Sequence, residues 1–209
     1  MIIINFKNYV TGKDALKLAK KIQRYLPKAL ISVPALDLQP ISKKTKLAVI
    51  AQHVSCFHKG RATGYVIPEF AKHDGAKGTL LNHSEHRLTF DQIKKTMKEC
   101  ERVNLKVILC AANLSEVKKF IKLRPYAIAY EDKKLVGSGK SITQYKAKDV
   151  ENFVRLLRNK KIVPFCGAGI SSAEDIKAAK KLGCKGVLIA SAITNSKNPK
   201  SLLREISRV

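Results

Sequence analysis

The 209-residue chain is short of acidic residues, with 16 Asp and Glu against 41 Lys and Arg and a formal net charge of +25 at pH 7. Such an excess should attract polyanions, which makes nucleic acid a partner to consider. The lysines, however, are spread along almost every predicted helix and are not interleaved with aromatic residues. Lys13, Lys17 and Lys21, for example, have the spacing of a solvent-facing helix side. We therefore expect nucleic-acid binding to be non-specific at most.

The chain also lacks a cysteine pattern typical of metal sites or disulfide frameworks. Its five cysteines are odd in number, widely spaced and without a CxxC pair. Such cysteines are typical of small buried hydrophobic side chains in a reducing cytosol. The first apolar run meets Asn5 and Lys7 after a few residues, which fits neither a signal peptide nor a membrane span. We expect a cytoplasmic protein with no metal and no membrane association.

No linker, low-complexity segment or composition break divides the chain, and 45% of its residues are hydrophobic. Short β-rich runs alternate with longer helical patterns from end to end. The predicted strands cover residues 2–6, 29–33, 47–51, 78–82, 106–110, 127–130, 161–164 and 186–189. The predicted helices lie near residues 13–26, 36–45, 67–74, 87–103, 114–122, 146–159, 172–182 and 199–208.

Most of these strands are near-continuous apolar runs, as in a parallel sheet that is covered on both faces. Eight strands alternating with helices is the count of a (β/α)8 barrel, although a doubly wound open sheet alternates in the same way. We predict one α/β domain over residues 1–209, a TIM-type (β/α)8 barrel. Its helices should be shortened, since such barrels usually have about 250 residues.

Three apolar runs end in a reactive polar residue: Lys7, His83 and Glu131. In a parallel barrel all such strand ends meet on one face, where barrel enzymes carry out their chemistry. Glu131 precedes a long loop with glycines at its far end, a candidate lid that would exclude water and strengthen the carboxylate as a base. A helix beginning soon after His83 would favour the neutral imidazole. Lys7 is placed to face a developing enolate.

Small residues after the last two predicted strands indicate a phosphate site. Residues 165–171 read Phe-Cys-Gly-Ala-Gly-Ile-Ser, and residues 189–192 read Ile-Ala-Ser-Ala. Backbone N–H groups of such turns can approach an anion closely, and barrels often hold a phosphate at this place. This feature alone does not distinguish between barrel enzymes that act on phosphorylated substrates.

Five motifs together give the chain a family resemblance. They are Asn-Phe-Lys at 5–7, Ala-Gln-His-Val at 51–54, Gly-Thr-Leu-Leu-Asn-His-Ser-Glu at 78–85, Gly-Ser-Gly at 137–139 and Cys-Gly-Ala-Gly-Ile-Ser at 166–171. In this order and spacing the chain resembles the triosephosphate isomerases, in their compact archaeal form, over essentially its whole length. The resemblance implies an aldose–ketose isomerase that interconverts dihydroxyacetone phosphate and D-glyceraldehyde 3-phosphate in glycolysis and gluconeogenesis, with no cofactor.

The resemblance also implies residue roles. Glu131 would be the base that moves a proton between two carbons through an enediol(ate), and His83 would polarise the carbonyl and move protons between oxygens. Lys7 would supply positive charge, with Asn5 positioning groups nearby. The other substrate-binding positions implied in this way are Val136, Gly137, Ser138, Gly169, Ala190 and Ser191.

Two positions depart from the family pattern. Asp132 stands where the family usually has proline, so the lid could lose rigidity, and a second carboxylate could make the base more basic. Ala192 stands where relatives often carry glycine, which could alter the phosphate site slightly. Neither departure affects the three reactive residues, so we expect an active enzyme.

The resemblance further predicts a homodimer, with dimers pairing into a tetramer as an alternative. The loop after the third predicted strand, residues 52–66, is long. In the family this loop inserts beside the active site of the neighbouring subunit, with Thr63 at the matching position. Because the net charge opposes association, the interface should be depleted of lysine.

Two other functions remain open at this level. A different barrel enzyme acting on a phosphorylated metabolite, such as a sugar-phosphate epimerase or an indole-forming synthase, would explain residues 165–192 equally well. It would not explain the motifs at 5–7 and 82–85. A basic nucleic-acid-binding barrel that has lost catalysis predicts damaged catalytic positions and a clustered basic patch, and the sequence shows neither.

Overall fold

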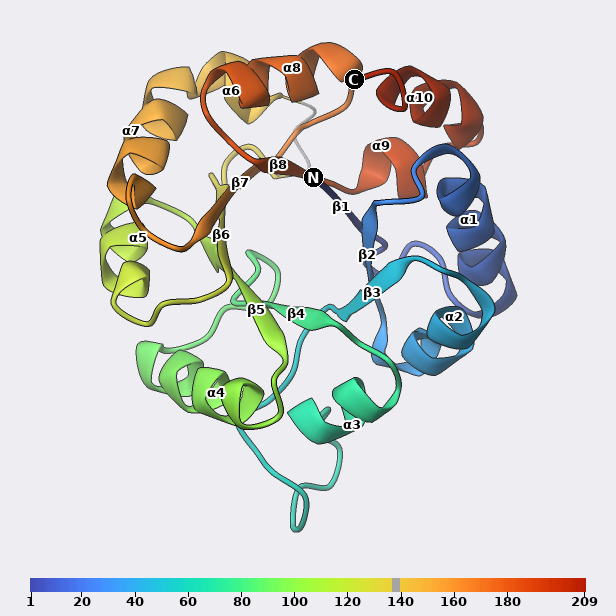
Figure 1. The fold of residues 1–209 in the computed structure, drawn as a ribbon, viewed down its shortest axis with the longest axis vertical. Coiled ribbons are helices and arrows are strands. Elements are labelled where there is room, and N and C mark those ends of the chain that lie inside the picture. The colour runs from blue at the N-terminus through green and yellow to red at the C-terminus, as the bar shows by residue number, and fades with distance from the viewer. Residues whose placement is uncertain (137–139) are drawn as a thin grey trace.

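The computed structural model describes residues 1–136 and 140–209, and in it eight parallel strands close into a barrel in chain order. β8 pairs with β1, and helices surround the barrel (Figure 1). The strands are β1 (Ile2–Asn5), β2 (Leu30–Val33), β3 (Ala48–Ala51), β4 (Gly78–Leu81), β5 (Lys106–Ala111), β6 (Ala127–Glu131), β7 (Val163–Gly167) and β8 (Gly186–Ile189). The predicted barrel is confirmed, and the open sheet is excluded because β1 and β8 are not edge strands.

The helices are short, as the chain length predicts. They are α1 (Gly12–Tyr25), the 3-10 turn η1 (Ala35–Asp37), α2 (Leu38–Lys44), α3 (Pro68–His73), α4 (Phe90–Arg102), α5 (Leu114–Ile121), α6 (Ile142–Tyr145), α7 (Ala147–Leu157), α8 (Ala173–Lys181), α9 (Ser191–Thr194) and α10 (Pro199–Ile206). The one-turn helices α6 and α9 were not predicted, because a single turn has no periodic apolar pattern to read.

The apolar core has two layers, which explains the near-continuous apolar strands. Alternate strand residues such as Ile3, Leu80 and Phe165 fill the inside of the barrel. The residues between them pack outward against the helices, for example against the buried Leu18 and Ile22 of α1. Both faces of the strands are therefore largely buried, and hydrophobic burial is the main stabilising term.

The largest boundary error concerns β7, predicted at 161–164 and observed at Val163–Gly167. Pro164 removes one N–H donor but does not end the strand, since Phe165, Cys166 and Gly167 continue the pairing with β6. This shift matters because it brings Gly167 opposite Glu131.

A second correction concerns the start of α4, predicted near residue 87 and observed at Phe90. Thr89 caps the helix: its hydroxyl accepts the Gln92 N–H at 3.2 Å, and its own N–H donates to Gln92 Oε1 at 2.9 Å. Arg87 lies before the cap and donates to the backbone oxygen of Asn82 at 3.2 Å. Residues 82–88 therefore form a loop above β4, which is available to carry functional groups.

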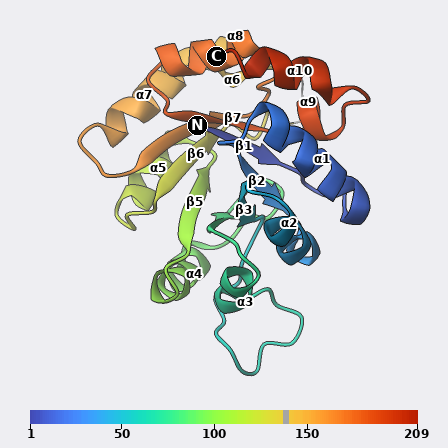
Figure 2. The same cartoon turned by 45° about the vertical axis from the view of Figure 1, so that its right-hand side comes forward.

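The loop between β3 and α3 extends away from the barrel in both views (Figure 1 and Figure 2). Thr63 lies on it and is exposed, and Phe57 packs on Tyr65 with ring centroids 4.2 Å apart. A projecting loop with an exposed tyrosine is suited to contact another molecule.

All five cysteines are free thiols. Cys100, Cys110, Cys166 and Cys184 are buried as expected, whereas Cys56 is only half-buried. Burial raises the pKa of Cys100 to about 12, so this thiol is unreactive at neutral pH. Within the described residues, no helix combines the length and apolarity that crossing a bilayer requires.

Candidate active site

A cavity of about 220 Å³ opens at the carboxyl ends of the strands. It brings together most of the residues that the sequence singled out, although they are far apart in the chain. The predicted residues that line it are Asn5, Lys7, His83, Glu131, Val136, Gly169, Ala190 and Ser191. Gly137 and Ser138 lie outside the described residues, and Thr63 lies on the projecting loop.

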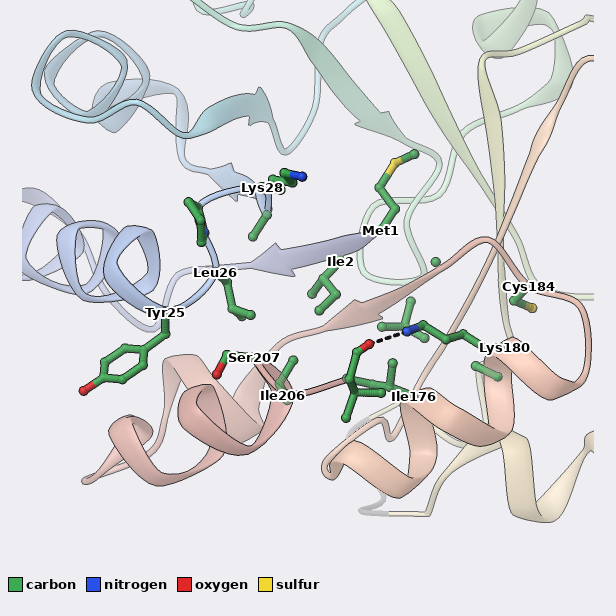
Figure 3. A pocket seen from close by; sticks show the side chains of 16 residues that line it. Met1, Ile2, Tyr25, Leu26, Lys28, Ile176, Lys180, Cys184, Ile206 and Ser207 are labelled. Atoms are coloured by element: carbon green, nitrogen blue, oxygen red, sulfur yellow. Dashed lines mark hydrogen bonds between the residues drawn. The ribbon is translucent and has the colours of Figure 1, made fainter.

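A larger cavity of about 320 Å³ lies at the opposite end of the barrel, below the start of β1 (Figure 3). It is lined by apolar side chains such as Ile2, Leu26 and Ile176. A hydrogen bond of 2.6 Å from Lys180 Nζ to the backbone oxygen of Val209 runs beside it (Figure 3). Among the described residues, no Asp, Glu or His side chain lines this cavity, so we place the acid–base chemistry at the smaller one.

Glu131 is the last residue of β6, and alternation puts its side chain on the same face as Ala127 and Ala129 inside the barrel. Only 5% of the residue is exposed, and Oε2 has no hydrogen-bond partner among the described residues. Gly167 leaves room for the carboxylate, since a Cβ there would lie 3.3 Å from Oε1. A buried carboxylate with an unpaired oxygen is a strong acceptor for a substrate proton.

His83 faces that carboxylate, with Nε2 3.6 Å from Glu131 Oε2. The backbone N–H of Glu85 donates to Nδ1 at 3.2 Å, and Glu85 Oε2 lies 3.8 Å from the same nitrogen. With Nδ1 as an acceptor, Nε2 is the ring nitrogen that can donate a proton into the cavity. The sequence assigned the neutral imidazole to the N-terminus of a nearby helix, but α4 begins only at Phe90. The turn at residues 83–86 replaces the helix N-terminus in this role.

Lys7 enters from the loop after β1, and its Nζ forms a 2.6 Å ion pair with Glu85 Oε1. Its backbone is in the left-handed region, with φ of 45°, and two side chains hold it there. Asn5 Oδ1 accepts the Lys7 N–H at 2.9 Å, and Gln52 Nε2 donates to the Lys7 carbonyl at 2.8 Å. The ammonium group is therefore fixed beside the cavity.

Sequence reasoning assigned no role to Glu85 and Gln52, which hold Lys7 and His83 from outside the cavity. Glu85 and Gln52 belong to the sequence motifs at 78–85 and 51–54. The position of Glu85 near His83, and of both residues within family motifs, could have indicated a supporting role. Asn82 also acts as a support: its side chain donates to the Cys110 carbonyl at 2.9 Å and accepts the Leu88 N–H at 3.0 Å. These contacts fix both ends of the loop that carries His83.

The turn after β7 and the segment after β8 form the small-residue wall of the cavity. Gly169 has φ of 75°, and a Cβ there would overlap the carbonyl of Lys140. The turn after β7 therefore packs directly on the segment that leads into α6. Ala192 also lines the cavity, so its methyl group is present where the family resemblance led us to expect glycine.

Asp132 lies beside Glu131 but does not line the cavity. Its Oδ1 accepts the Lys134 N–H at 2.9 Å, and its Oδ2 lies 3.8 Å from Lys146 Nζ. The carboxylate thus closes a local turn and lies beside a cation. A hydrogen-bonded turn stands where the family resemblance led us to expect the fixed φ of proline.

Taken together, the cavity holds an unpaired carboxylate oxygen, a neutral imidazole N–H and a cation against a wall of small residues. This set can remove a proton from carbon beside a carbonyl group while neutralising the charge that develops on oxygen. Among the described residues, no group of three or more His, Cys, Asp or Glu side chains is arranged to hold a metal ion.

Relatives in the archaea match almost the whole chain. Triosephosphate isomerase of Methanothermus fervidus is 39% identical, covering 99% of this chain and 96% of the relative. Those of Methanocaldococcus jannaschii and Saccharolobus solfataricus are 35% and 37% identical, covering 99% and 98% of this chain and 98% and 93% of theirs.

The fold is also similar to a crystal structure of triosephosphate isomerase from Bartonella henselae, with a TM-score of 0.71. That chain is 16% identical, and the match covers 90% of this chain and 91% of the other. Because the identity is low, this similarity supports the fold and not the function. The sequence model of the family described as triosephosphate isomerase matches residues 1–206. The chain therefore belongs to the triosephosphate isomerase family.

Proposed function

We propose that this protein is a triosephosphate isomerase that interconverts dihydroxyacetone phosphate and D-glyceraldehyde 3-phosphate through an enediol(ate). The observation that carries the proposal is the pair formed by Glu131 and His83. Glu131 presents a buried, unpaired Oε2, and the neutral His83 presents its Nε2 proton 3.6 Å away in the same cavity. A planar substrate with a carbonyl beside a hydroxyl-bearing carbon would lie against both groups, with the carbon facing the carboxylate and the oxygens facing the imidazole.

Glu131 acts as the base in this mechanism. Its carboxylate takes a proton from the hydroxyl-bearing carbon of the ketose, the C–H electrons form a carbon–carbon double bond, and the carbonyl electrons move onto oxygen. Returning the proton to the neighbouring carbon gives the aldose. Because the same oxygen accepts and returns the proton, the reaction consumes no cofactor.

His83 and Lys7 stabilise the intermediate. The Nε2–H of His83 donates to the oxygen on which charge develops, and a neutral donor can pass its proton between the two oxygens without an imidazolium intermediate. The Lys7 ammonium adds positive charge at the same place. Its ion pair with Glu85 keeps it fixed beforehand, so little reorganisation is needed during the reaction.

The phosphate of the substrate binds at the small-residue wall. Gly169, Ala190 and Ser191 line that side of the cavity, and turns of small residues let backbone N–H groups approach an anion. Val136 closes the cavity from the segment after β6. We assign Gly137 and Ser138 to the same site from the family resemblance alone.

We further propose a homodimer in which the loop between β3 and α3 completes the site of the other subunit. A second cavity of about 210 Å³ adjoins the first and shares Asn5, Lys7 and His83 with it. The loop with Thr63 projects from the barrel (Figure 2), and in the proposed dimer it fills this cavity on the second copy. Pairing of such dimers into a tetramer is the alternative assembly.

For its place in the cell, we propose that the enzyme works in the cytoplasm, in glycolysis and gluconeogenesis. The proposal follows from the substrates, since both pathways pass through these two triose phosphates. Fractionation of the source cells with a specific antibody would test it, and recovery of the protein with the membranes would contradict it.

The function itself is tested with an assay that couples the conversion of D-glyceraldehyde 3-phosphate to NADH oxidation. We expect the wild type to be active and Glu131→Asp to lose about 10²–10³-fold in kcat, since a shorter base misplaces the proton acceptor by roughly 1 Å. Glu151→Asp, on the exposed side of α7, is the control and should keep full activity. No activity in a folded wild type, or equal activity in Glu131→Asp, would contradict the proposal.

A further inference from the structure

Asp175 lies in the first turn of α8, yet only 3% of the residue is exposed. A buried carboxylate is unfavourable unless hydrogen bonds replace its hydration. Burial alone would raise the pKa of Asp175, but hydrogen bonds from Ser141, Ser171 and Ser172 outweigh it and hold that pKa below its ordinary value. The side chain is therefore a carboxylate at neutral pH, and its partners show what it does.

The two oxygens of Asp175 face two different segments. Oδ2 accepts the backbone N–H of Ser171 at 3.0 Å and the hydroxyl of Ser172 at 3.2 Å. Oδ1 lies 3.4 Å from Thr143 Oγ1 and 3.3 Å from Gln144 Nε2, both in α6. One buried side chain thus links the turn after β7 to the segment after β6.

The same two segments also meet through their backbones. The N–H of Ile142 donates to the carbonyl of Ala168 at 3.1 Å, and Gly169 packs against Lys140 too closely to admit a Cβ. Ala168, Gly169, Ile170 and Ser171 line the active-site cavity, whereas Asp175 does not. Asp175 therefore makes no direct contact with a ligand in this cavity, and the turn is its nearest connection to it.

We infer that Asp175 is a positioning residue that shapes the anion-binding wall of the active site. Asp175 accepts hydrogen bonds from the Ser171 N–H and the Ser172 hydroxyl at the start of α8. These bonds hold the turn in the conformation in which residues 168–170 face the cavity. By bonding α6 as well, Asp175 fixes the distance between the two segments that flank the wall. The inference rests on the proposed function in one respect, since it identifies the anion as the substrate phosphate.

Removing the carboxylate should leave the Ser171 N–H without its acceptor and release α6 from the turn. Asp175→Ala should then bind inorganic phosphate at least 10-fold more weakly than the wild type and raise KM by a similar factor, with a smaller change in kcat. Asp175→Asn keeps the size of the side chain and one oxygen that can accept the Ser171 N–H. Its NH2 group can then face Thr143 and Gln144, whose side chains can accept as well as donate hydrogen bonds. Its phosphate affinity should fall by only about threefold.

Asp37 offers a matched control. It is also 3% exposed, and its Oδ1 accepts the Gly12 N–H at 2.8 Å, which links two other loops on the same end of the barrel. Asp37 does not line the active-site cavity. Asp37→Ala should therefore lower the thermal midpoint while leaving phosphate affinity within twofold of the wild type.

The experiment is titration calorimetry of the full chain with inorganic phosphate, alongside KM and kcat for each variant. Wild-type phosphate affinity in Asp175→Ala would overturn the inference, as would an equal loss in Asp37→Ala, which would indicate general destabilisation. If Asp175→Ala does not fold, Asp175→Asn decides: an unchanged affinity overturns the inference, and a weakened one supports it. Phosphate binding requires no turnover. A wild type without isomerase activity would therefore refute the proposed function, while the phosphate affinities of the Asp175 variants would still test this inference.

Discussion

At the residue scale, the site depends on backbone conformations that ordinary side chains rarely adopt. Lys7 and Asn82 have φ of 45° and 61°, and each such conformation costs on the order of 1 kcal/mol or more. In both cases side-chain hydrogen bonds offset part of that cost: Asn5 and Gln52 bond the backbone of Lys7, and Asn82 bonds Cys110 and Leu88. The strained residues direct the cation and the imidazole toward the cavity.

Gly169 gives a prediction at this scale. In Gly169→Ala the new Cβ would overlap the carbonyl of Lys140 and sit on a φ of 75°, so the turn and the segment before α6 must separate. We expect kcat/KM to fall by about 10²-fold, on the scale of a 1 Å misplacement of positioning groups.

The matched control for this change is Gly12→Ala. Gly12 also has a positive φ, 59°, but a Cβ there would meet nothing within 4 Å. This variant should lose roughly 1 kcal/mol of stability from backbone strain and keep its activity. Similar steady-state kinetics for the two variants would refute the packing argument.

His53 gives a prediction about pH. Its ring stacks on His86 at a centroid distance of 4.0 Å, and burial together with the nearby His86 lowers the pKa of His53 from 6.5 to about 4. Between these values the unfolded chain binds more protons than the native state, so stability falls as pH falls. From pH 7.5 to pH 5 this group should remove up to about 2 kcal/mol.

Urea denaturation at the two pH values measures this effect. His53→Gln should reduce the loss of unfolding free energy between pH 7.5 and pH 5. His73→Gln, at a side chain that is 79% exposed, should lose as much as the wild type. The explanation fails if the wild type and His53→Gln lose stability equally on acidification.

At the element scale, local capping decides where α4 begins and so frees the loop that carries His83. Thr89 accepts the Gln92 N–H at 3.2 Å, and Gln92 bonds back to the N–H of Thr89. Thr11 precedes α1 in the same way, but its side chain makes no capping hydrogen bond. Thr89→Ala should therefore cost about 1 kcal/mol of unfolding free energy, and Thr11→Ala only a few tenths. Equal losses in urea denaturation would contradict this reading of the caps.

At the scale of the whole molecule, the net charge of +25 opposes association of identical chains. If the proposed dimer forms, raising the salt concentration from about 50 to 500 mM should strengthen it by screening this repulsion. Thr63→Arg should weaken the dimer at least 10-fold, because it adds a cation to the loop that would lie near Lys7 of the other copy. Multi-angle light scattering across a dilution series measures both effects.

Ser201→Arg is the control, since it adds the same charge at an exposed position of α10. It should dimerise as the wild type does. A wild type that is monomeric at both salt concentrations would refute the proposed assembly.

The order of strands and helices was readable from the sequence, because each strand is a short apolar run and each longer helix has a periodic apolar face. Seven strand boundaries agree with the prediction to within one residue at each end, β7 being the exception. The lone turns α6 and α9 were missed because four residues carry no period. The start of α4 was missed because the capping box at Thr89 overrides the longer polar pattern before it.

The sequence by itself determined the barrel and the reactive set of Lys7, His83 and Glu131, since strand ends in a parallel barrel must converge on one face. Only the tertiary structure decided what holds that set in place. The Glu85 N–H makes His83 a neutral donor, Gly167 makes room for Glu131, and Asp175 joins two loops. Some of these contacts join residues that are tens of positions apart in the chain. They depend on how the loops are arranged in space, and no local pattern of residue types predicts that arrangement.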